Sequence, residues 1–86
     1  MEGGLLAATQ RFPTRRDAIE ALAAKDEEFS SLCADLAEAE AALRRWAATP
    51  PPGRDLRCAE YRDLVDSLAG EIETALDAAT RAEDRA

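Results

Sequence analysis

The stretch Thr49-Pro50-Pro51-Pro52-Gly53 (TPPPG) divides this sequence into two long segments. Three consecutive prolines remove amide donors and clash with a preceding helical turn, and the glycine permits the chain to reverse. The segments on both sides follow helical periodicities, so we expect two helices joined by a tight turn. The predicted bounds are a first helix over about 14–48, a turn over 49–53 and a second helix over about 55–82.

The first segment carries an apolar row with a seven-residue repeat. The row consists of Leu22, Phe29, Leu36 and Leu43. This spacing is typical of a helix that packs along one partner helix. The row narrows at Asp26, and this acid either sets the register from the seam or reaches solvent from its edge.

The residues before this row predict the start of the first helix. Thr14 is a good N-cap, Asp17 supplies an acid three residues later, and Phe12 can fold back on the first turn. Arg15 and Arg16 oppose the helix dipole, whose N-terminus favours acids. They either form solvated surface or have a binding role, and the sequence leaves both open.

The second segment has a more regular seam, with steps of three and four residues. Its members are Cys58, Tyr61, Val65, Leu68, Ile72, Ala75, Ala79 and Ala82. Gly70 lies in this helix at a cost of about 1 kcal/mol relative to alanine, which favours a close contact there.

Together the two seams predict an all-α fold, an antiparallel two-helix hairpin over residues 12–83. Residues 1–11 are expected to be a disordered tail and residues 84–86 a frayed end. A two-helix hairpin has one mutual interface and leaves flanking apolar groups exposed. These groups are Trp46, Leu64 and Leu76. We therefore expect a homo-oligomer, most simply a four-helix bundle.

Composition excludes several classes of function. Among 86 residues, 18 are acidic and 11 are basic, and the net charge of −7 disfavours nucleic acid and anionic membranes as partners. The sequence contains no histidine, and its two cysteines lack the spacing of a metal motif. We expect no catalytic, cofactor-binding or metal-binding residues, and no disulfide between Cys33 and Cys58. The absence of a basic start and of a long apolar run favours a cytoplasmic protein.

Charge is distributed unevenly along the chain. Residues 44–62 hold five arginines against two acids, a net charge of +3 at the turn end. Arg44 and Arg45 either complement the dipole of the first helix or dock on an acidic partner. In an antiparallel dimer that partner is the cluster Asp26, Glu27 and Glu28 of another copy. Trp46 either caps the end of the core or anchors a partner.

Two stretches carry a resemblance to a known family. The matching positions in the first are Phe12, Pro13, Arg16, Asp17, Ile19, Leu22, Phe29, Ser31 and Leu32, and those in the second are Leu68, Glu71 and Ile72. This pattern resembles the YdcH-like family of small bacterial helical-hairpin proteins. The resemblance implies a cytoplasmic antiparallel hairpin of unestablished function without catalytic residues. The chain departs from the family in its acidic second helix and its proline-rich turn.

These observations predict a non-catalytic, self-associating helical hairpin that acts as a protein–protein interaction module. Two alternatives remain. A tryptophan before the turn is similar to secreted WXG-type helical proteins, although Ala48 stands where that pattern needs glycine. An accessory subunit of an enzyme complex would have the same shape.

Overall fold

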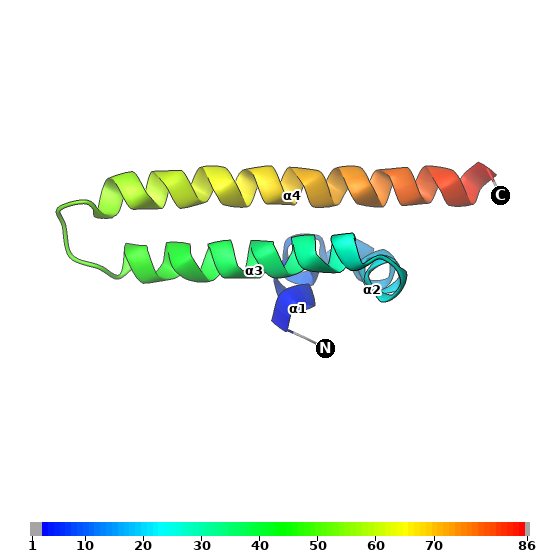
Figure 1. The fold of residues 1–86 in the computed structure, drawn as a ribbon, viewed down its shortest axis with the longest axis horizontal. Coiled ribbons are helices and arrows are strands. Elements are labelled where there is room, and N and C mark those ends of the chain that lie inside the picture. Colours follow the sequence, from blue (N-terminus) through cyan, green and yellow to red (C-terminus); the bar gives the residue numbers. More distant parts are fainter. Residues whose placement is uncertain (1–2, 86) are drawn as a thin grey trace.

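The computed structural model describes residues 3–85, and this part of the chain is helical with no strand. Its elements are α1 (Gly3–Arg11), the short 3-10 turn η1 (Pro13–Arg15), α2 (Arg16–Lys25), α3 (Glu27–Ala47) and α4 (Arg54–Arg85) (Figure 1). The prediction of an all-α fold is confirmed. None of the helices within the described range is long and apolar enough to cross a membrane.

The helices α3 and α4 lie side by side and antiparallel (Figure 1). At the end of α3, the amide of Ala48 donates to the carbonyl of Arg44 at 3.2 Å, and the chain then enters the proline stretch. Gly53 has a φ of 91°, a conformation that favours glycine, and α4 follows directly. The turn therefore lies where the sequence predicted it.

The expected continuous helix over residues 14–48 is interrupted at Asp26, which corrects that prediction. Asp26 is extended, with φ −134° and ψ 104°, and its carboxylate accepts a hydrogen bond of 3.1 Å from the amide of Phe29. The acids Glu27 and Glu28 occupy the first turn of α3, where the helix dipole favours them. Asp26 is therefore an N-cap, and Lys25 ends the preceding helix.

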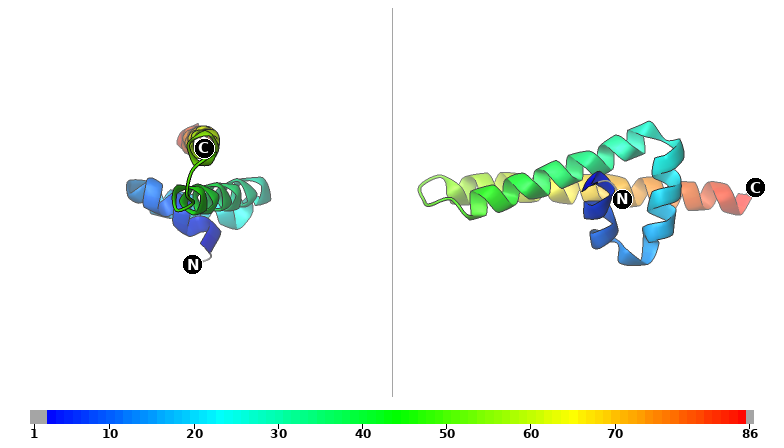
Figure 2. Two further views of the ribbon diagram at one scale, coloured as in Figure 1. Left: turned by 90° about the vertical axis from the view of Figure 1, so that its left-hand side faces the viewer. Right: turned by 90° about the horizontal axis from the view of Figure 1, so that it is seen from below.

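A helix also occupies most of the segment that was predicted to be a disordered tail. α1 packs on the side of α3 that faces away from α4 (Figures 1 and 2), and its Ala7 and Ala8 are buried. A Cβ atom on Gly4 would lie 3.2 Å from Cα of Ala34, so glycine permits this close approach. Residues 1 and 2 lie outside the described residues. At the other terminus, where a frayed end was predicted, α4 continues to Arg85 and only residue 86 lies outside them.

The start of α2 also differs from the prediction. Pro13 begins the 3-10 turn η1, α2 begins at Arg16, and neither element has a side-chain capping bond. Thr14 lies inside η1, so it cannot cap α2 as predicted. Phe12 does pack against the core.

α2 then runs across α4 (Figure 2), and this placement completes the core. The largest fully buried side chains are Ile19, Leu36, Ile72, Leu76, Thr9 and Cys33. Leu76 is only 1% exposed, because α2 lies over it. The expectation that Leu76 remains exposed is therefore wrong. Both cysteines are buried and free.

Candidate functional site

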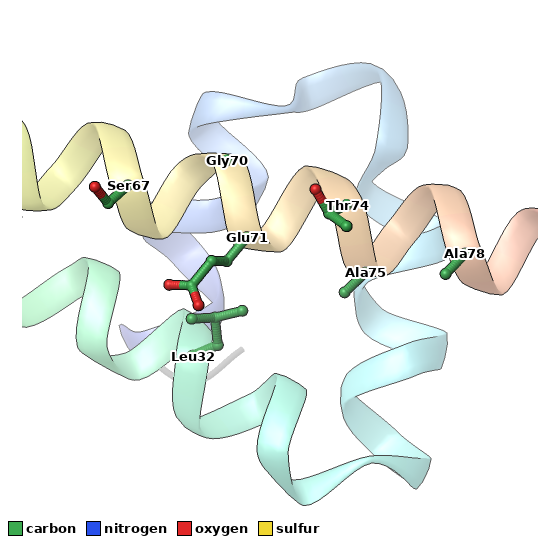
Figure 3. A pocket seen from close by; sticks show the side chains of 7 residues that line it. All are labelled: Leu32, Ser67, Gly70, Glu71, Thr74, Ala75 and Ala78. Atoms are coloured by element: carbon green, nitrogen blue, oxygen red, sulfur yellow. The ribbon is translucent and has the colours of Figure 1, made fainter.

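An open groove runs between α3 and α4 on the surface of the molecule. Its volume is about 670 Å³, and small residues dominate its lining. The lining residues are Leu32, Ser67, Gly70, Glu71, Thr74, Ala75 and Ala78 (Figure 3). Such a surface lets another helix approach the backbone of α4 closely.

Gly70 lies in this groove without a contact inside the chain that requires it. A Cβ atom at this position would meet nothing within 4 Å, and the residue is exposed. The close contact that the sequence predicted at Gly70 is therefore absent from the described residues. The cost of a glycine inside a long helix, about 1 kcal/mol, is not offset by packing within the chain.

Carboxylates border the groove. The Glu71 side chain extends toward Leu32 (Figure 3), and Leu32 also lines a neighbouring hollow with Glu27, Glu28 and Asp35. None of these four acids forms an ion pair with the residues that the structure describes. The α3 side of the groove therefore has an uncompensated negative charge above an apolar floor.

One face of α4 continues from the groove toward the turn. Arg57, Leu64 and Glu71 are seven residues apart, so they lie on nearly the same side of the helix. Leu64 is 44% exposed, and Leu56, near the same face, is 67% exposed. On this face of α4, here called the uncovered face, the apolar Leu64 thus lies between the cation of Arg57 and the anion of Glu71.

The turn end is basic and partly apolar. The Arg57 guanidinium lies 5.7 Å from the ring centroid of Trp46, and it pairs with Glu60 at 3.6 Å. Arg54 pairs with Asp55 at 3.5 Å. Trp46 is partly buried beneath Arg57, which agrees with a role at the end of the core and leaves part of the ring accessible.

A second groove, of about 450 Å³, lies nearer the turn and joins α1 to the helix pair. Arg11 bridges Glu40 of α3 at 3.8 Å and Asp66 of α4 at 3.4 Å, and Arg44 and Arg62 also line this groove. The charges of this groove are mixed, and only Arg11, Glu40 and Asp66 pair with one another. Through Arg11, the end of α1 is linked to both α3 and α4.

The candidate residues predicted from the sequence lie in five different places. Glu27 and Glu28 lie beside the groove, whereas Arg44, Arg45 and Trp46 lie at the far end of α3 near the turn. Leu64 lies on the uncovered face of α4. Asp26 caps α3, and Leu76 belongs to the core.

Sequence reasoning missed four residues of the uncovered face and the groove. They are Leu32, Leu56, Arg57 and Glu71. The seven-residue spacing of Arg57, Leu64 and Glu71 was the signal that could have found two of them. It was hidden because the apolar seam of the same helix has the same period.

The types of side chain available in these grooves are limited. The chain has no histidine, and residues 3–85 contain no group of three side chains suited to hold a metal ion. Burial raises the pKa of the Cys33 thiol from 9.0 to about 11, so this thiol stays protonated at neutral pH. The grooves are open to solvent, and acids, arginines and apolar side chains line them.

Comparison of the chain with protein-family models, curated proteins and solved structures finds no significant match in any of the three.

Proposed function

We propose that this protein is a non-catalytic interaction module that associates with itself through the groove between α3 and α4. The observation that carries the proposal is Gly70. It lies inside a 32-residue helix, in an open groove, with nothing within 4 Å of the position of a Cβ atom. A partner that approaches the α4 backbone closely gives this costly residue a role.

The exposed leucines support the same proposal. Leu56 and Leu64 lie on the uncovered face of α4, whereas α1 and α2 cover other parts of α3 and α4. Burying each leucine at an interface would contribute about 1 kcal/mol or more, given their partial exposure. A second copy of a chain this small is a common way to complete such a core.

The proposal includes a cytoplasmic setting and a relation to the YdcH-like proteins. Both cysteines are free thiols, which favours a reducing compartment. The antiparallel pair of α3 and α4 is what the resemblance implies, whereas the break at Asp26 and the docked α1 are additions to a plain hairpin.

Sedimentation equilibrium at micromolar concentration tests self-association directly. We expect the wild-type chain to be a dimer or a larger oligomer. Gly70→Gln places a long polar side chain in the groove, where there is space for it within one chain. At concentrations where the chain is monomeric, we expect this variant to unfold at higher urea concentration, because glutamine is the better helix former. We nevertheless expect it to associate at least roughly tenfold more weakly.

The matched control is Ala59→Gln, at an exposed position of α4 outside the groove. This variant should associate like the wild type. A wild-type chain that stays monomeric at these concentrations would overturn the proposal.

A further inference from the structure

The uncovered face of α4 has a charge pattern that is complementary to itself. Arg57 and Glu71 lie seven residues to either side of Leu64 on this face. When two copies of such a helix lie antiparallel with Leu64 at the centre, each arginine meets the glutamate of the other copy. The two copies form a closed dimer, because a two-fold axis produces both arginine–glutamate contacts at once.

We propose that two copies pair in this way, with α4 against α4 in antiparallel orientation around a two-fold axis at Leu64. This inference rests on the proposed self-association and specifies its geometry. Gly70 lies six residues from Leu64, about 120° around α4, and is therefore at the edge of the contact. Leu64 packs on its own copy, and Arg57 of each chain pairs with Glu71 of the other, about 10 Å along the helix from the axis.

The surroundings of these residues fit the pairing. Glu71 forms no ion pair within residues 3–85. Arg57 pairs with Glu60 of its own chain, but its side chain is about half-exposed, so a second carboxylate can still reach the guanidinium. Beyond Leu64, the face continues with Ser67, Thr74 and Ala78, which are small enough for a second helix to lie close.

In the same register, the basic turn end of one copy and the acidic groove of the other have complementary charges. Arg54 of one copy reaches the level of Thr74 in the other, which lies on the groove beside Leu32. The acids Glu27, Glu28 and Asp35 border that groove, whereas residues 44–62 carry five arginines against two acids. The basic turn end of each copy thus faces the acidic rim of the other, which favours an antiparallel over a parallel pair.

Charge exchange tests the pairing of Arg57 with Glu71. We expect Arg57→Glu and Glu71→Arg each to weaken self-association by roughly tenfold or more, because two contacts become repulsive. An equimolar mixture of the two variants should associate about as tightly as the wild type, since every contact is then attractive. This rescue also shows that both variants are folded. Variants that remain unaffected alone, or that fail to restore association when mixed, would contradict the pairing.

Cysteine cross-linking tests whether the two-fold axis passes at Leu64. Under mild oxidation, Leu64→Cys should form an intermolecular disulfide, because Cα atoms at the axis lie within the roughly 7 Å that a disulfide spans. Ala78→Cys should not, because in the antiparallel pair its two copies are about 40 Å apart. The wild-type chain is the background control, since Cys33 and Cys58 are buried.

The outcomes separate the two proposals. A monomeric wild-type chain refutes both the self-association and the pairing. A chain that associates but forms no link at Leu64→Cys, or that links equally at Ala78→Cys, refutes the antiparallel pairing and leaves self-association standing.

Discussion

The guanidinium of Arg15 lies 2.8 Å from the carboxylate of Asp77 and joins the start of α2 to α4. Arg15 opposes the dipole at the start of its own helix, which is why its role was left open by the sequence. The ion pair gives Arg15 a structural role, because the pair ties α2 to α4 where α2 crosses it above Leu76. Arg16 forms no ion pair with the rest of the described chain.

Removal of this ion pair should destabilise the fold slightly. Both side chains are partly exposed, so we expect Arg15→Ala and Asp77→Ala each to lower the free energy of unfolding by about 0.5–1 kcal/mol. Urea unfolding of both single variants and of the double variant measures their coupling. Arg16→Ala is the control and should be nearly neutral. A coupling of zero would show that α2 does not need the pair.

Asp26 allows a prediction that separates two structures of the first half of the chain. With α3 capped at Asp26, Asp26→Ala removes the hydrogen bond to the Phe29 amide and should cost about 1 kcal/mol of unfolding free energy. Asp26→Asn keeps an accepting oxygen and should cost much less.

A continuous helix over residues 14–48 predicts the opposite effect of Asp26→Ala on the free energy of unfolding. Alanine in the middle of a helix is more favourable than aspartate by a few tenths of a kcal/mol, so Asp26→Ala would then stabilise the protein. Urea unfolding together with helicity from circular dichroism decides between them. A stabilised, more helical Asp26→Ala variant would contradict the break between α2 and α3.

The signals that predicted α4 and the turn are local. Consecutive prolines cannot continue a helix, and the seam from Cys58 to Ala79 has one period throughout. The break at Asp26 also had a local signal. Lys25 followed by Asp26, Glu27 and Glu28 is typical of one helix ending and another beginning, but the seven-residue row across it favoured a continuous helix.

The position of α1 could not be predicted in the same way. A nine-residue helix that begins with two glycines is unstable alone, and its stability comes from packing on α3. The spacing of Leu5, Ala8 and Phe12 was a weak helical signal. The exposure assigned to Leu76 was wrong for a related reason, because only the bend at Asp26 brings α2 over it.

Gly4 should be sensitive to substitution, in contrast to Gly70. A Cβ atom on Gly4 would lie 3.2 Å from Cα and 3.3 Å from Cβ of Ala34, so a β-branched side chain forces α1 away from α3. We expect Gly4→Val to lower the unfolding free energy by roughly 1–3 kcal/mol, the usual cost of overpacking.

Hydrogen exchange locates that effect. Amide protection should fall in α1 and remain unchanged in α4 near the turn. Gly70→Ala is the matched control, and it should raise stability under conditions where the chain is monomeric, because its Cβ meets no atom within 4 Å. Equal effects of the two substitutions would contradict the close approach of α1 to α3.

The buried thiol of Cys33 should make stability fall at alkaline pH. Its pKa is raised from 9.0 to about 11 by desolvation, so the unfolded chain loses this proton at lower pH than the folded chain. The contribution of the protonated Cys33 thiol to the free energy of unfolding is complete below about pH 9 and is lost as the pH rises through 11. At pH 10.5 the loss amounts to about 2 kcal/mol.

Comparison with Cys33→Ala isolates this effect from other groups that titrate in the same range. At pH 7 we expect the wild type to be the more stable protein, because alanine leaves a small cavity in the core. Urea unfolding at pH 7 and at pH 10.5 should show that this advantage shrinks by about 2 kcal/mol or reverses. A difference that stays constant between the two pH values would mean that the folded chain ionises this thiol as readily as the unfolded one, and hence that water reaches it.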